Sequence, residues 1–216
     1  MELLSVVEDT KIKIPVLLAS YYGLRRSEII GLKWSAIDFT NKSININHVV
    51  VHISENGKQT LVGRNGTKTK KSQRTLPLLE DVEKILLDLK EKQEENKLLY
   101  KSSYNKKYLE YVCVDDMGTL LNPDYVSHKF TKVLKSNSMK IIRFHDLRHS
   151  CASLLLANGI SMKQIQVWLG HSNYNTTANI YAHLDKNHMN ESASTIENAL
   201  KAKKDTCSPL NNKYIF

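Results

Sequence analysis

The stretch HDLRHSCASLLLAN occupies residues 145–158 and begins with a histidine and an arginine three positions apart. Its apolar residues follow a helical period and are expected to face a core: Leu147, Cys151, Leu154 and Leu155. His145 and Arg148 share the opposite face of that helix, directed away from the core. Because an arginine fork matches the oxygens of a phosphate, this pair predicts a site for a phosphate group.

The composition indicates a basic, folded protein. Of its 216 residues, 31 are Lys or Arg and 22 are Asp or Glu, which gives a net charge of +9. This surplus makes a nucleic acid the first candidate partner. Two stretches, 64–74 and 129–143, each hold five basic residues and no acidic one, which predicts surfaces that face phosphates.

Three cysteines, Cys113, Cys151 and Cys207, are scattered without a CxxC spacing. Their number and spacing argue against a disulfide framework or a zinc–thiolate site and favour a reducing cytoplasm. We see no signal peptide and no apolar run long enough to span a bilayer, so we expect no membrane partner.

The hydrophobic pattern predicts an α+β domain, mainly helical, with one small antiparallel β-sheet over residues 43–78. A turn in that sheet is expected at Asn65-Gly66. Local start and stop signals predict helices over these ranges: 14–22, a short one carrying 27–30, 79–96, one from 122, 145–158, one ending at 170, 175–183, and a polar one to about 203. We expect one domain over 1–204 and a C-terminal tail over 205–216.

Four further residues complete a possible catalytic set. Arg25 lies at a helix junction, and Lys68 lies in a basic turn. His171 follows Gly170, and Tyr181 comes ten residues later. Taken singly, Arg25 could cap a helix, Lys68 could be solvated, and Tyr181 could be a packing residue. Together with His145 and Arg148 they offer a nucleophile, proton carriers and phosphate ligands.

Four segments carry a family resemblance, with matching order and spacing: Tyr22–Leu32 (YGLRRSEIIGL), His145–His149 (HDLRH), Leu169–Ser172 (LGHS) and Ile180–His183 (IYAH). They resemble the conserved boxes of the tyrosine recombinase family of phage-type integrases. Thr67-Lys68-Thr69 resembles the lysine segment of that family's β-hairpin. The resemblance covers roughly residues 5–200 and implies the DNA breaking-rejoining fold of a tyrosine recombinase catalytic domain.

The resemblance implies the roles of these residues. Tyr181 would attack the scissile phosphate and form a 3′-phosphotyrosine bond, with Arg25, Arg148 and His171 binding the phosphate oxygens. Lys68 would protonate the leaving 5′ oxygen, and His145 would accept the tyrosine proton. No cofactor and no metal is expected. Glu28 and Asp146 would either orient these side chains or lie on helix surfaces.

The same resemblance implies site-specific recombination or integration of a phage or mobile element. The partners would be double-stranded DNA, a tetramer of this protein on DNA, and accessory DNA-bending or directionality proteins in a bacterial cytoplasm, at the nucleoid. Such integrases usually carry DNA-binding domains before the catalytic one, so we expect this chain to be an excised or truncated form.

Three alternatives stay open at this point. A DNA-binding module with an inactive site would leave DNA strands uncut. A type IB topoisomerase would use similar chemistry without pairing two sites. A metal-dependent hydrolase could use the eight histidines, and insensitivity of cleavage to EDTA would exclude it.

Overall fold

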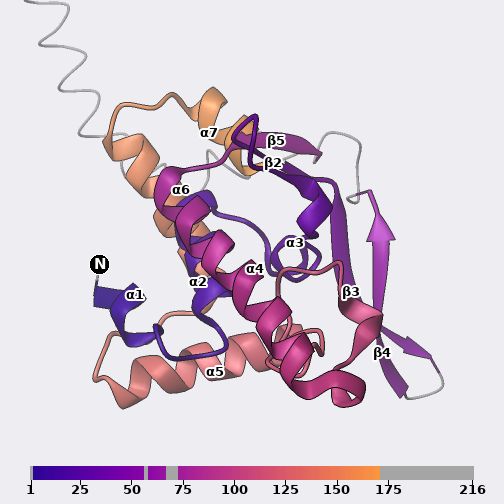
Figure 1. The fold of residues 1–216 in the computed structure, drawn as a ribbon. Helices are drawn as coiled ribbons and strands as arrows, with labels where there is room; N and C mark the ends of the chain where they lie inside the picture. The colour runs from indigo at the N-terminus through magenta and orange to yellow at the C-terminus, as the bar shows by residue number, and fades with distance from the viewer. Residues whose placement is uncertain (1, 56–57, 67–72, 171–216) are drawn as a thin grey trace, which may run out of the picture. The chain divides into compact units, whose positions relative to one another are not determined.

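A computed structural model describes residues 2–55, 58–66 and 73–170 and confirms a mainly helical α+β fold (Figure 1). The helices of this part of the chain, in order, are α1 (Glu2–Val6), α2 (Lys13–Tyr22), α3 (Arg26–Ile30), α4 (Glu80–Tyr100), α5 (Pro123–Ser136), α6 (Asp146–Ala157) and α7 (Met162–Leu169). Single 3₁₀ turns cover Trp34–Ala36, Lys101–Ser103 and Lys106–Tyr108.

Helix α2 lies at the centre of the core. It is apolar on most sides, and its buried residues are Ile14, Pro15, Val16, Leu17, Leu18, Ala19 and Tyr22. Pro15 fits in its first turn because the first turn of a helix needs no backbone N–H donor there. The helix ends at Gly23, which adopts the left-handed conformation with a φ of 61°. The helix ends where the sequence predicted and begins one residue earlier, at Lys13. Helices α3 and α6 pack against it.

The strands form two antiparallel sheets where the sequence predicted one. Strands β1 (Ile37–Asp38), β2 (Ser43–Ile46) and β5 (Arg74–Pro77) form the first, in the order β1-β2-β5. Strands β3 (His48–Glu55) and β4 (Lys58–Asn65) pair only with each other among the described strands. The prediction failed because the chain leaves the first sheet at Asn47, a single residue between β2 and β3.

Burial alternates along β2. Ile44 and Ile46 are buried, and Ile44 is paired with Leu76 of β5. The Asn65-Gly66 pair ends β4, and the backbone N–H of Gly66 donates to the carbonyl of Asn47 at 2.8 Å. The described ladders contain no β4–β5 pair, so this turn does not join two strands of one hairpin.

Helices α4 and α5 close other sides of the core. Val82 and Leu86 are the buried residues of α4, which runs four residues beyond its predicted end to Tyr100. Helix α5 begins where the sequence predicted, since the side chain of Asn122 accepts from the backbone N–H of Asp124 at 2.8 Å. Its buried stripe includes Val126 and Phe130.

Helices α6 and α7 are linked by a short connection, and α7 lies beside β5 (Figure 1). A capping box of Ser161 and Gln164 begins α7, and Gly170 ends the helix, as predicted, with a φ of 68°. The prediction for Leu154 was wrong, because this side chain is 64% exposed. Leu154 lies about two turns beyond the buried Leu147 on α6, where the described residues no longer cover the apolar face of the helix.

No helix in the described part of the chain is both long and apolar enough to cross a membrane. The predicted helices after residue 171 and the predicted domain boundary at 204/205 lie outside the described residues.

Candidate functional site: an arginine cluster at the end of α7

Arg25 is placed by the tight connection between α2 and α3. Gly23 leaves α2 in the left-handed conformation, and a Cβ atom there would come within 2.5 Å of Leu169 Cδ2. Arg25 then adopts an extended backbone directly before α3. Its backbone N–H donates to Glu28 Oε2 at 2.9 Å and its Nη1 to Glu28 Oε1 at 2.7 Å. Glu28 therefore fixes both the backbone and the guanidinium of Arg25.

Arg148 on α6 is buried, which corrects the expectation that it points away from the core. Its side chain is 2% exposed, and its Nη1 donates to the carbonyl of Gly23 at 2.5 Å. Its Nη2 donates to the carbonyl of Leu169 at 2.7 Å. The helical period placed Arg148 on the polar face, but these two chain segments cover that face and supply acceptors for the guanidinium.

Arg74, the first residue of β5, is a third arginine at this site, and the sequence prediction missed it. Its Nη1 and Nη2 donate to the two carboxylate oxygens of Glu28 at 3.2 and 3.1 Å. Its Nε donates to the carbonyl of Trp168 at 2.7 Å. A signal was present in the sequence: Arg74, Leu76 and Leu78 alternate, so an arginine shares a face with two buried leucines.

Three successive carbonyls at the end of α7 accept hydrogen bonds from the three arginines. Trp168 accepts from Arg74 and Leu169 from Arg148, and Gly170 accepts from Nη2 of Arg25 at 3.0 Å. The last carbonyls of a helix have no partner within the helix and carry partial negative charge. The arginines satisfy them, and this fixes the chain immediately before His171.

The charges of this site shift the pKa values of its members. Burial alone would raise the pKa of Glu28, but the bonds and charges of Arg74 and Arg25 lower it below its usual value. Glu28 is therefore ionised at neutral pH. Burial and the positive charge of Arg25 lower the pKa of Arg148 to about 9. A bound anion would oppose that shift, because opposite charge favours the ionised guanidinium.

His145 lies three residues before Arg148, at the start of α6, and is exposed to solvent. Its ring meets that of His149 edge to face, with the centroids 5.2 Å apart. Partial burial and the adjacent His149 and Arg148 lower the pKa of His145. The ring is therefore neutral at pH 7 and has a lone pair that can accept a proton.

The second predicted positioning residue, Asp146, does not contact the arginine cluster in the described hydrogen bonds. Its carboxylate accepts from the backbone and the side chain of Arg143, with the shortest side-chain bond at 2.8 Å. Of the two carboxylates named from the sequence, Glu28 orients a candidate catalytic arginine and Asp146 pairs with Arg143 just before α6.

Three predicted site residues, Lys68, His171 and Tyr181, lie outside the described residues. The structure brings Arg25 and Arg148 together and places His145 on the same helix as Arg148. Among the described residues, no group of His, Cys, Asp and Glu has the arrangement of a metal site.

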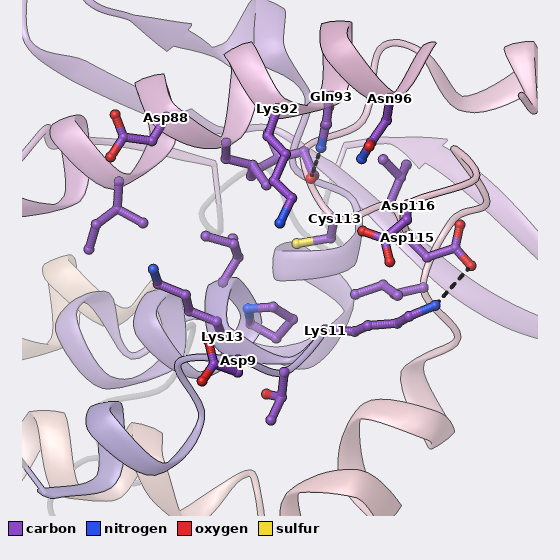
Figure 2. Close-up of a pocket in the computed structure, with 18 of the residues that line it drawn as sticks. Asp9, Lys11, Lys13, Asp88, Lys92, Gln93, Asn96, Cys113, Asp115 and Asp116 are labelled. Atoms are coloured by element: carbon purple, nitrogen blue, oxygen red, sulfur yellow. Dashed lines mark hydrogen bonds and ion pairs between the residues drawn. The ribbon is translucent and has the colours of Figure 1, made fainter. Parts of the chain in front are cut away.

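Figure 2 shows a separate polar cavity of about 450 Å³, lined by the start of α2, by α4 and by residues 112–116. Lys11 forms an ion pair across it with Asp115 at 3.6 Å. Gln93 donates to the carbonyl of Val112 at 2.8 Å. None of the predicted site residues lines this cavity, so it is not part of the arginine cluster.

Comparison with known proteins identifies relatives of this chain in sequence. The model of the phage integrase family matches residues 2–188. The chain is 31% identical over 185 residues to a XerC-like tyrosine recombinase of Caldanaerobacter subterraneus subsp. tengcongensis, covering 81% of this chain and 46% of that protein. It is 30% identical over 180 residues to the ICEBs1 integrase of Bacillus subtilis, covering 82% and 46%. The chain thus spans about half the length of these relatives.

Solved structures show the same fold. The Tn1549 transposon integrase, in complex with transposon right end DNA, matches with a TM-score of 0.68 and 20% identity, over 89% of this chain and 62% of that one. The XerA recombinase matches with a TM-score of 0.60 and 22% identity, over 89% and 59%.

Proposed function

Because the chain belongs to the phage integrase family, we propose that it is the catalytic domain of a site-specific DNA recombinase that cuts and rejoins strands through Tyr181. The observation that carries this proposal is the arginine cluster. Arg25 and Arg148 meet at the end of α7, directly before His171, and Glu28 holds the Arg25 guanidinium. A phosphodiester is the anion that this set of donors suits best.

In the proposed reaction, the phenol oxygen of Tyr181 attacks the scissile phosphorus and the bond to the 5′ oxygen breaks. Neutral His145 accepts the phenol proton, and Lys68 gives a proton to the departing 5′ oxygen. The product is a 3′-phosphotyrosine and a free 5′ hydroxyl. A 5′ hydroxyl from a second strand reverses these steps and rejoins the DNA, so the energy of the broken bond is kept.

The arginines act on the charge of the transition state. Negative charge builds on the non-bridging oxygens as the fifth bond to phosphorus forms, and donors fixed in advance stabilise it at no cost of reorganisation. Arg25 and Arg148 fulfil this condition, because Glu28 and the carbonyls at the end of α7 hold their guanidinium groups. His171 adds a hydrogen bond to the same oxygens.

We further propose that the reaction needs no metal ion and no cofactor. Two arginines and a lysine neutralise the phosphate, which is the task that metal ions perform in many enzymes of phosphoryl transfer. Cleavage in EDTA at the same rate as in its absence supports this part of the proposal, and loss of cleavage in EDTA contradicts it.

The proposed partner is double-stranded DNA, engaged by a tetramer of the protein that pairs two sites, with accessory DNA-bending or directionality proteins. We propose that it acts on the nucleoid in the bacterial cytoplasm. The net charge of +9 supports a DNA partner. An apolar cavity of about 590 Å³ along α6, lined by Leu3, Met139, Leu147, Leu154 and Leu155 among others, supports association between copies.

The test is strand cleavage of a pool of nicked suicide duplexes with randomised sequence. The nick releases a short fragment on cleavage and traps the covalent complex. We expect covalent complexes with the wild-type chain and a loss of about 100- to 1,000-fold with Arg148→Ala, as for removal of one donor to a developing oxyanion. Equal trapping by the two proteins would contradict the proposed role of the cluster.

A further inference from the structure

Arg74 is the member of the cluster that the proposed chemistry does not use. Its side chain is 6% exposed, and it forms a bidentate pair with Glu28, which is itself 1% exposed. Its described bonds go to both carboxylate oxygens of Glu28 and to the carbonyl of Trp168. The two Nη atoms of Arg74 are directed at the Glu28 carboxylate, so Arg74 is placed to hold Glu28 and the end of α7 in position.

Glu28 links Arg74 to Arg25. The same oxygen, Glu28 Oε1, accepts from Nη1 of Arg25 at 2.7 Å and from Nη1 of Arg74 at 3.2 Å. If Arg74 were lost, Glu28 would keep its full charge with Arg25 as its remaining ion-pair partner among the described residues. The carboxylate and the Arg25 fork would then shift toward each other, away from the geometry that the cluster now imposes.

Arg74 also holds the end of α7. Its Nε donates to the carbonyl of Trp168, three residues before His171. A Cβ atom on Gly170 would come within 2.6 Å of Arg74 Nη1, so the guanidinium lies tight against this turn. One side chain thus touches the segment that precedes His171 and the carboxylate that orients Arg25.

The position of Arg74 in the chain adds a third link. It begins β5, which pairs with β2 in the core sheet, and it follows the basic segment with Lys68 by six residues. Strand β5, which follows that segment in the chain, is therefore anchored at the cluster. A buried arginine at this point connects three parts of the proposed site that are far apart in the sequence.

We propose that Arg74 is a positioning residue for strand cleavage, which holds Arg25 through Glu28 and the end of α7 through Trp168. This inference rests on the proposed function. A purely structural role would be different: loss of Arg74 would then lower stability without a specific effect on the rate of strand cleavage.

The test is a double-mutant cycle on the single-turnover rate of cleavage of the nicked duplexes, with the dissociation constant for DNA measured in parallel. Arg74→Lys keeps the positive charge but cannot reach both Glu28 and Trp168 with a fork. We expect it to lower the cleavage rate by roughly 10- to 100-fold, the effect of a small misplacement of catalytic groups. The dissociation constant for DNA should change by less than about threefold, because the charge is kept.

The decisive comparison uses a background that lacks Arg25. If Arg74 acts partly through Arg25, Arg74→Lys should lower the rate by a clearly smaller factor in Arg25→Ala than in the wild type, since coupled residues are not additive. The effect that remains in Arg25→Ala is the part that acts through Trp168. Arg26→Lys is the matched control. Arg26 neighbours Arg25, but its described bonds go to Pro123, Asp124 and Ser127 on α5. It should change the cleavage rate little in either background.

Urea denaturation of each variant checks that it is folded, and Arg74→Gln is the second variant in case Arg74→Lys is not. Three outcomes would overturn the proposal. The first is that Arg74→Lys lowers the cleavage rate by the same factor in Arg25→Ala as in the wild type. The others are an unchanged rate in Arg74→Lys and failure of both Arg74 variants to fold. Failure of the proposed function looks different, because the wild-type chain itself would then form no covalent complex.

Discussion

Replacing Glu28 by glutamine tests the cluster independently of any DNA. Glu28 is 1% exposed and accepts four hydrogen bonds, two from Arg25 and two from Arg74. In glutamine, one carboxylate oxygen becomes an NH₂ group. The NH₂ group then faces N–H donors of Arg25 and Arg74 in place of an acceptor, and the negative charge that compensated the two arginines is lost.

The expected loss of stability follows from this geometry. Removing one partner of a buried ion pair costs about 3–5 kcal/mol, because the remaining charge stays buried without compensation. Domains of this kind are stable by about 5–15 kcal/mol, so the change removes a large share. With a urea m-value of about 2 kcal/mol/M, the midpoint of unfolding should fall by about 1.5–2.5 M.

The effect should also depend on pH in a defined direction. The pKa of Glu28 is lowered in the folded state by Arg74 and Arg25, against the opposing effect of burial. A carboxylate with a lowered pKa contributes stability above its unfolded pKa and loses it as the pH falls through its folded pKa. The difference between wild type and Glu28→Gln should therefore be constant near pH 7 and shrink in acid below pH 4.5.

The assay is urea unfolding followed by tryptophan fluorescence, where Trp168 reports on the end of α7. Glu94→Gln is the control, since Glu94 lies in an exposed pair with Lys97 and should change the free energy of unfolding by about 0.5 kcal/mol or less. A midpoint for Glu28→Gln that shifts no more than that of Glu94→Gln would refute the reasoning, because Glu28 would then not be a buried, essential counter-ion.

Three further predictions concern single groups. The kcat/KM for DNA cleavage should decrease with falling pH only below pH 6.5, because the lowered pKa keeps His145 neutral above that pH. A decrease in kcat/KM that begins above pH 6.5 would contradict the role of His145 as the base. A sulfur at the 5′-bridging position should restore cleavage to Lys68→Ala, since a thiolate leaves without a proton. Rescue of Lys70→Ala instead would assign the proton donor to Lys70, two residues further along the same basic segment. Burial raises the pKa of Cys113 to about 12 and that of Cys151 to about 11, so both thiols should react slowly with iodoacetamide. Mass spectrometry should find both unlabelled at pH 8 until urea unfolds the protein. Rapid labelling of either thiol in the folded protein would contradict this prediction.

The ends of the helices could be predicted because their signals are local. Gly23 and Gly170 end α2 and α7 in the left-handed conformation that glycine adopts without strain. Asn122 and Ser161 begin α5 and α7 by accepting hydrogen bonds from backbone N–H groups within the next three residues. Each of these signals lies within a few residues of the helix end that it determines.

The sheet arrangement and the full cluster could not be predicted in the same way. Arg74 is 46 residues from Glu28 and 94 from Trp168, and its partners there are a carboxylate on another element and a backbone carbonyl. Backbone carbonyls leave no trace in a pattern of side chains. For the same reason the burial of Arg148 was missed, since its acceptors are the carbonyls of Gly23 and Leu169.

The most direct test of the account is to identify the residue that carries the DNA. The covalent complex trapped on nicked duplexes would be digested with protease and nuclease, and the peptide with the remaining nucleotide sequenced by mass spectrometry. The account predicts a nucleotide linked through its 3′ phosphate to Tyr181 and no complex with Tyr181→Phe. A link to another residue, such as Tyr174, or a complex that persists in Tyr181→Phe would contradict it.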